Sequence, residues 1–83
     1  MKNRTETLIE IRNDNLYTLL AREIDLVYHN EILIPRHNLI EDKKLRKQKI
    51  DQNHEQIKNI KILIGDLEGI IKIIDGMIKK EAK

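Results

Sequence analysis

Isoleucine and leucine recur every seven residues through the second half of the chain. A second line, mostly isoleucine or leucine, follows three residues behind the first. The two lines are Ile50, Ile57, Ile64, Ile71 and Ile78, and then Ile60, Leu67 and Ile74. This heptad pattern is typical of a long helix that buries one edge against other helices, with Asn53 as its one polar exception. It predicts a helix over residues 38–80, with its apolar core beginning near residue 50.

The first segment of the chain is apolar around more than half of its circumference when it is wound as a helix. Leu16, Leu20, Ile24 and Val27 lie on one line, and Leu19, Leu26 and Leu33 repeat every seven residues beside it. Contact with a single neighbouring helix needs a narrower arc than this. We therefore expect a helix over about residues 5–33 that packs against two neighbours.

Pro35, the one proline, separates the two segments. The residue before a proline is pushed away from helical geometry, so we expect the chain to turn at residues 34–37. Asn38 and Glu41 have the spacing of a capping box at the start of the second helix. The predicted fold is all-α: a single domain, residues 1–83, built as an antiparallel two-helix hairpin with a long C-terminal heptad helix.

A β-hairpin is the alternative for the isoleucine-rich stretch. "IKILI" and "IIKII" would be its strands and "GDLEG" its turn, because isoleucine favours strands and glycine favours turns. However, the seven-residue spacing continues unbroken from the polar segment "KIDQNHEQIKNI", which has no strand character. The pattern therefore favours a helix.

The two predicted helices differ in length, and this difference predicts a docking surface. With a turn at 34–37, Leu16 would face Ile57 and Ile9 would face Ile64. The first helix would therefore extend along the second helix only as far as about Ile64. The apolar surface beyond that point would have nothing of its own chain to cover it. We expect an interface there, assembling a dimeric helical bundle or coiled coil with a second copy or another helical protein. The module would act through the apolar surface of residues 60–78, and its interface residues are Ile64, Leu67, Ile70, Ile71, Ile74, Met77 and Ile78.

Composition supports a partner chain. The 83 residues include two tyrosines but no phenylalanine, tryptophan or cysteine. A domain this small with so few large side chains usually needs disulfides, a metal or a second subunit, and disulfides are excluded here. The net charge of +2 marks neither a nucleic-acid coat nor an acidic tail.

A basic run gives the alternative function. Lys43, Lys44, Arg46, Lys47 and Lys49 contain no acid among them, and residues 36–61 carry a net charge of +4 against −2 for residues 1–35. Such a cluster can neutralise phosphates in sequence-independent binding. No aromatic residue is interleaved with it for base stacking. A dimeric nucleic-acid-associated protein is thus the alternative to a protein-interaction module.

The sequence gives little support to catalytic chemistry or to a cofactor. It has no cysteine or serine nucleophile and no glycine-rich phosphate loop. His29 and His37 flank the predicted turn, and Asp51, His54 and Glu55 share a helical turn without the spacing of a zinc site. Charges interrupt the apolar stretch of residues 60–80 too often for a membrane helix. We expect a cytoplasmic, non-catalytic interaction module without a small-molecule substrate, whether adaptor, chaperone, inhibitor or dimerisation unit.

Overall fold

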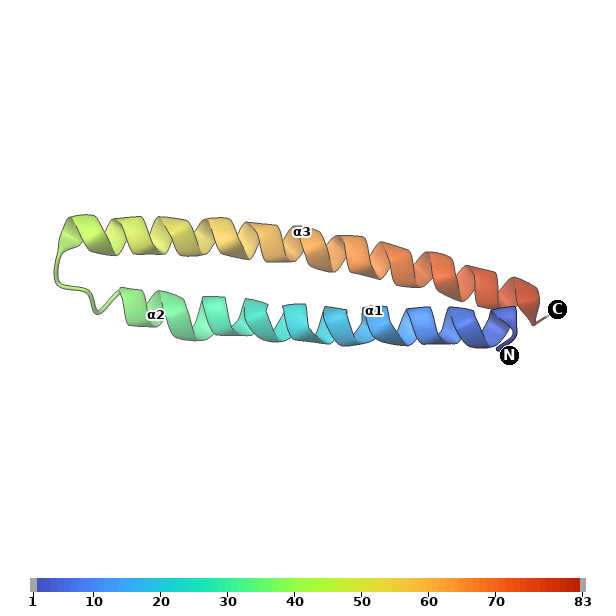
Figure 1. Cartoon of the computed structure of the whole chain (residues 1–83). Coiled ribbons are helices and arrows are strands. Elements are labelled where there is room, and N and C mark those ends of the chain that lie inside the picture. Colours follow the sequence, from blue (N-terminus) through green and yellow to red (C-terminus); the bar gives the residue numbers. More distant parts are fainter. Residues whose placement is uncertain (1, 83) are drawn as a thin grey trace.

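The protein is a helical hairpin, here in a computed structural model that describes residues 2–82. Two arms lie side by side and antiparallel, so that the two ends of the chain meet at one end of a rod of 61 × 18 × 17 Å (Figure 1). Residues 2–82 contain no strand, so the all-α prediction is confirmed and the β-hairpin alternative is wrong. The elements are α1 (Arg4–Val27), a π-helical turn η1 (Tyr28–Leu33), α2 (Ile34–His37) and the long α3 (Lys43–Glu81).

Both long helices begin at a side chain that caps the backbone. Asn3 Oδ1 accepts a hydrogen bond of 2.8 Å from the backbone N–H of Glu6 at the start of α1. Asp42 Oδ1 accepts one of 3.0 Å from the backbone N–H of Leu45 at the start of α3. Each cap satisfies one of the N–H groups that have no partner inside a helix. Asp42, and not the predicted Asn38, therefore sets where α3 begins.

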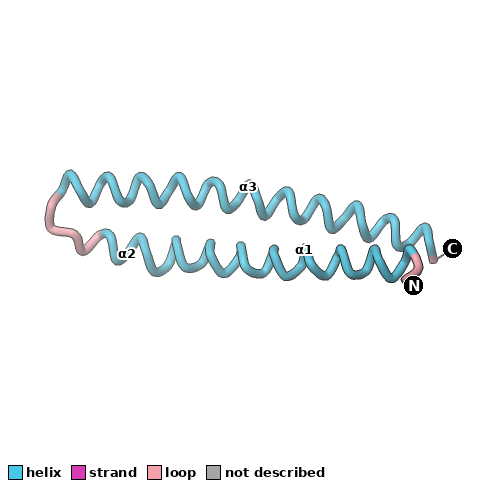
Figure 2. Tube along the Cα trace, in the orientation of Figure 1, coloured by secondary structure: helices cyan, strands magenta, loops and turns pink. Residues whose placement is uncertain are grey.

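Pro35 does not end the first arm, so the turn predicted at residues 34–37 is wrong. In a regular α-helix its ring would collide with the carbonyl of Glu31, four residues earlier. The chain avoids this by widening into the π-helical turn η1, in which the N–H of Ile34 bonds to the carbonyl of His29. Pro35 then lies in the first turn of α2, directly after this wide turn. The chain reverses later, after α2, in the loop before α3 (Figure 2).

The later turn changes which residues face each other. Arg4 Nε bonds to Glu81 Oε1 at 2.8 Å, and Arg12 Nη1 lies 3.2 Å from Asp75 Oδ1. The predicted pairings of Leu16 with Ile57 and of Ile9 with Ile64 are therefore wrong. Moving the turn by about five residues moves the pairing by about ten, because one arm lengthens as the other shortens.

Because the arms match in length, α1 reaches the C-terminal isoleucines. The prediction that nothing in the chain covers the last quarter is wrong: Ile74 is 6% exposed and belongs to the core. The other buried apolar residues are Leu8, Ile57 and Ile60. The core is thus a thin line of side chains between two helices. The other large apolar side chains lie at the edges of the seam or on the outer faces of the helices.

Candidate interaction surfaces

The face of the first arm, α1 and η1, that lies against α3 is only partly apolar. Leu8 is buried and Leu19, Leu26 and Leu33 are half-buried along it. Four polar residues alternate with these leucines at helical spacing: Arg12, Asn15, Arg22 and His29. The buried Nε atoms of Arg12 and Arg22 have no hydrogen-bond partner among the described residues. The seam between the arms therefore contains both apolar and polar side chains.

Asn53 is the most deeply buried polar residue of the described chain, at 2% exposed. Its side-chain amide donates a hydrogen bond of 2.9 Å to the carbonyl of His29. Its Oδ1 lies 3.3 Å from His29 Nδ1, so that this ring nitrogen acts as the donor. Both polar atoms of the Asn53 side chain thus have a partner across the seam.

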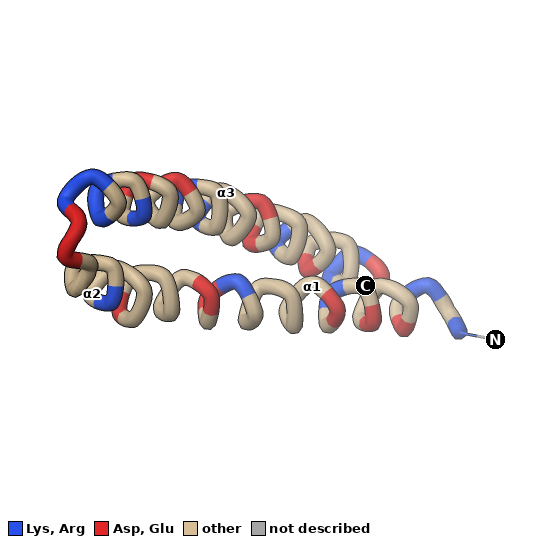
Figure 3. Tube along the Cα trace, turned by 60° about the vertical axis from the view of Figure 1, so that its left-hand side comes forward, with Lys and Arg blue, Asp and Glu red and all other residues tan. Residues whose placement is uncertain are grey.

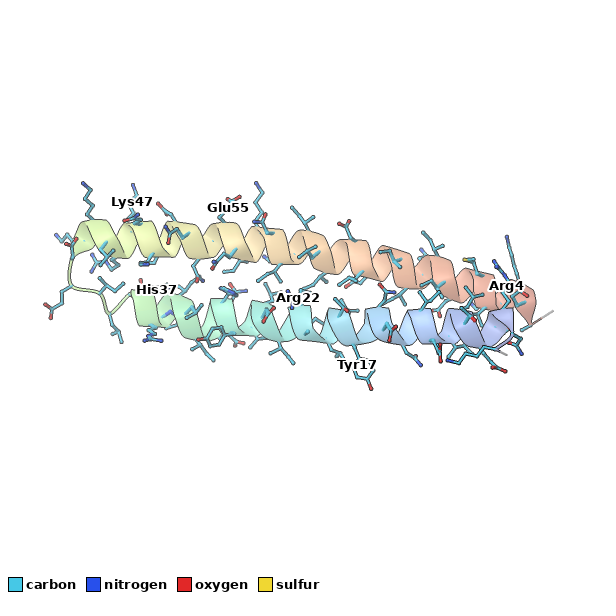
Figure 4. All side chains as sticks on the ribbon, in the orientation of Figure 1. Arg4, Tyr17, Arg22, His37, Lys47 and Glu55 are labelled. Atoms are coloured by element: carbon cyan, nitrogen blue, oxygen red, sulfur yellow. The ribbon has the colours of Figure 1, made fainter. Side chains whose placement is uncertain are left out.

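The outer side of α1 carries an apolar stripe that stays largely exposed in the described part of the chain. Its members are Leu16, Tyr17, Leu20, Ile24 and Val27, which we call the α1 stripe. Their exposed fractions are 38%, 75%, 55%, 69% and 52%. Tyr17 points directly away from α3 (Figure 4). The sequence predicts two neighbours for this helix, and the hairpin supplies one of them.

Carboxylates surround the α1 stripe. Glu10 and Asp14 lie at its N-terminal end, Glu23 at its edge and Glu31 beyond its C-terminal end, and all four are exposed. Glu10 is paired with Lys2, whereas the other three have no ion pair among the described residues. Between residues 5 and 35 the only lysine or arginine residues are Arg12 and Arg22. Both are half-buried on the seam side, and Arg22 pairs with Asp25 at 3.2 Å. The outer face of α1 is therefore apolar in its middle and acidic around it.

The predicted interface residues on α3 divide between the seam and the surface. Ile74 is buried against α1, and Ile70 is 43% exposed. The remaining predicted residues are half-buried: Ile64, Leu67, Ile71, Met77 and Ile78. Most of the predicted interface residues are thus at least partly covered within the hairpin, and Ile70 is the exposed one among them.

A second exposed apolar cluster lies on α3 around Ile70. Ile62, Leu63, Ile70 and Ile73, which we call the α3 patch, are 54%, 46%, 43% and 66% exposed. Helical spacing gathers them on one side of the helix. Asp66 and Lys80 lie on the line of Ile73, seven residues before and after it, and both are exposed. The sequence prediction missed Ile62, Leu63 and Ile73, because these residues lie outside the two heptad lines from which the interface was predicted.

The basic run lies at the turn end of the hairpin, where blue segments cluster in Figure 3. Lys43, Lys44, Lys47 and Lys49 are exposed, and none forms an ion pair with any residue of the described range 2–82. Arg46 is half-buried, and its guanidinium donates to the carbonyl of Ile40 at 3.3 Å. Four of the five predicted contacts are therefore available to an anionic partner, and the fifth helps to close the turn.

The histidines do not assemble a metal site. His29 contacts Asn53, His37 is half-buried beside the turn, and His54 is exposed on α3. Within residues 2–82 no group of three or more histidine, cysteine, aspartate or glutamate side chains is placed to hold a metal ion. No helix in that same range has the length and apolarity needed to cross a membrane.

Comparisons with protein-family models, with curated proteins and with solved structures found no match to this chain. The function must therefore be argued from the surfaces themselves.

Proposed function

We propose that this chain is a non-catalytic protein–protein interaction module that pairs with a second copy of itself through the α3 patch. One observation carries the proposal: the hairpin closes its seam and still keeps a cluster of large aliphatic side chains exposed on the outside of α3. The patch contains Ile70 and lies within residues 60–78, the part of the chain for which the sequence predicts an interface. The cytoplasmic location expected from the sequence stays a prediction.

The size of the α3 patch fits a dimer contact. The exposed parts of its four side chains amount to roughly 400 Å² of apolar surface, from the fractions above. A standard interface buries about 800 Å² on each partner, a little over half of it apolar. The α3 patch thus carries close to the apolar area of one side of such an interface, and Ile70 and Ile73 supply about half of it.

The charges beside the patch are arranged for self-recognition. In a two-fold contact each residue meets its counterpart in reverse order along the antiparallel helices. With Ile73 at the two-fold axis, Asp66 of one copy faces Lys80 of the other, because each lies seven residues from the centre. Two such pairs form at once, and Ile70 and Ile73 of both copies lie between them. Ile62 lies outside this contact, because it is eleven residues from the axis whereas α3 ends eight residues beyond Ile73, at Glu81. The same surface therefore serves as both halves of the contact.

Sedimentation analysis of the purified chain tests this proposal. The 9.9 kDa chain should sediment as a dimer at micromolar concentration, and Ile73→Asp should give a monomer with unchanged helix content by circular dichroism. Leu39→Asp, at the turn and 81% exposed, is the matched control and should remain dimeric. A monomeric wild-type chain, or an Ile73→Asp variant that remains dimeric, would overturn the proposal.

The basic run supports a second candidate function, a dimeric nucleic-acid-associated protein. Lys43 and Lys44 occupy the first turn of α3, where the helix dipole disfavours positive charge. No described carboxylate pairs with them or with Lys47 and Lys49. Four lysines without ion pairs at one end of the rod would suit phosphate groups. A binding measurement across a salt series separates this candidate from the first.

A further inference from the structure

We infer that the α1 stripe binds an amphipathic helix of a different protein, and that basic residues flank the apolar face of that helix. This inference rests on the proposed role as an interaction module, but it concerns the other arm of the hairpin. The α3 patch and the α1 stripe lie on separate helices and share no residue. The chain would thus join its own copy on one helix and a basic partner on the other.

The apolar spacing of the stripe suits a helix as its occupant. Tyr17, Leu20, Ile24 and Val27 follow one another at intervals of three or four residues, which lines them up along one side of α1. With Leu16, they expose on the order of 600 Å² of mostly apolar surface, against about 800 Å² for one side of a standard interface. A helix that lays its own apolar face along this line would cover the stripe from end to end.

The charges around the stripe decide what kind of helix fits. Asp14, Glu23 and Glu31 lie beside it without an ion pair among the described residues. Glu10 is paired with Lys2, and Arg12 and Arg22 pair with Asp75 and Asp25. Lysine or arginine beside the apolar face of the partner would meet these carboxylates, whereas aspartate or glutamate would be repelled. The stripe therefore selects a partner by the sign of its flanking charges.

The same charges argue against a second copy as the occupant. Two α1 stripes packed together would bring Asp14, Glu23 and Glu31 of one copy close to the same carboxylates of the other. The chain's own basic run offers Leu45 as its single apolar residue within 43–49, too little to fill the stripe. A helix from another protein satisfies both the apolar and the charge pattern.

Two synthetic helical peptides test the inference. Both carry leucine at the a and d positions of three heptads, about 21 residues, and they differ only in having lysine or glutamate at the flanking e and g positions. Fluorescence anisotropy should show the lysine peptide binding the full-length chain at least tenfold more tightly than the glutamate peptide. That difference should shrink as salt is raised, because exposed charges are screened. Equal affinities, or no binding of the lysine peptide, would overturn the inference.

Variants identify the surface that the peptide uses. Ile24→Asp should abolish binding of the lysine peptide, and the double variant Glu23→Lys, Glu31→Lys should reverse the preference between the two peptides. Ile73→Asp, on the other arm, is the control and should leave peptide affinity within twofold of the wild type. Binding that survives Ile24→Asp would contradict the assignment to the stripe.

The mass of each variant keeps this inference separable from the proposed dimer. Ile24→Asp should lose the peptide and keep the wild-type mass. A drop in mass for Ile24→Asp would mean that a second copy occupies the stripe, and the inference would be wrong. A monomeric wild-type chain that still binds the lysine peptide through Ile24 would refute the dimer and support the inference.

Discussion

The amide of Asn53 bonds to the carbonyl of His29 at 2.9 Å, across the seam and within the π-helical turn of the opposite arm. That carbonyl also accepts the N–H of Ile34, so it serves the wide turn and the seam together. Asn53, the polar residue in the heptad pattern of α3, thus contacts η1, the irregular turn that precedes Pro35 on the other arm. A buried polar residue at such a position fixes the register of packed helices, because sliding the arms would leave its amide without partners.

Removing this amide should destabilise the hairpin. We expect Asn53→Ala to lower the free energy of unfolding by about 1–3 kcal/mol, through the lost hydrogen bonds and the space left at a buried position. Asn59→Ala is the control, since Asn59 is exposed on the same helix, and should change stability by less than about 0.5 kcal/mol. Urea denaturation followed by circular dichroism measures both. Equal stability of Asn53→Ala and the wild type would contradict this role.

The register itself can be tested with paired cysteines, because the chain has none of its own. The variant His29→Cys, Asn53→Cys should form an intramolecular disulfide under mild oxidation, since the two residues touch across the seam. Leu16→Cys, Ile57→Cys represents the register of a turn at 34–37 and should stay reduced within the monomer. Non-reducing electrophoresis at low protein concentration distinguishes the two. A disulfide only in the second variant would show that the chain turns earlier.

Two adjacent isoleucines should respond very differently to the same substitution. Ile74 is 6% exposed at the seam and its neighbour Ile73 is 66% exposed in the α3 patch. We expect Ile74→Asp to cost more than about 3 kcal/mol and to unfold the hairpin, because it buries a charge without a partner. Ile73→Asp should leave the hairpin folded, because Ile73 contributes little to the packing within one chain. Similar thermal unfolding curves for the two variants, followed by circular dichroism, would contradict the assignment of inner and outer faces.

The nucleic-acid candidate makes a prediction of its own about salt. If the four exposed lysines at the turn contact phosphates, log K for a generic DNA duplex should fall with log salt with a slope of about −4. Changing Lys43, Lys44, Lys47 and Lys49 to glutamate should then abolish binding. Arg46 stays in place as part of the turn, where it bonds to Ile40. Unchanged or undetectable affinity in both proteins would leave the run as a solvated surface.

The heptad spacing was enough to predict the helical class and the long second helix. The inward face of the first arm was harder to predict, because it carries Arg12, Asn15, Arg22 and His29. The denser apolar line that contains Leu20 and Ile24 faces outward instead. Amphipathic patterning alone would choose the wrong face. The turn was misplaced because a helix boundary at Pro35 is the usual outcome, and the π-helical turn that avoids the clash has no strong sequence signature.

That misplaced turn also changed the predicted surface. A turn at 34–37 leaves Ile71, Ile74 and Ile78 beyond the end of the first helix, whereas the observed arms run together to Arg4 and Glu81. The sequence did predict that the chain has more apolar surface than one neighbouring helix can cover. Which residues stay exposed depended on the register, and therefore on the three-dimensional structure.

The central claim, self-association through the α3 patch, is tested most directly by reversing the two charges on either side of Ile73. Sedimentation at low salt should show that Asp66→Lys and Lys80→Asp each weaken the dimer at least tenfold, because each places like charges together at two symmetric sites. The double variant Asp66→Lys, Lys80→Asp restores opposite charges and should return the dimer affinity to within a few-fold of the wild type. Failure of the double variant to recover, or dimers unaffected by either single change, would contradict the proposed two-fold contact.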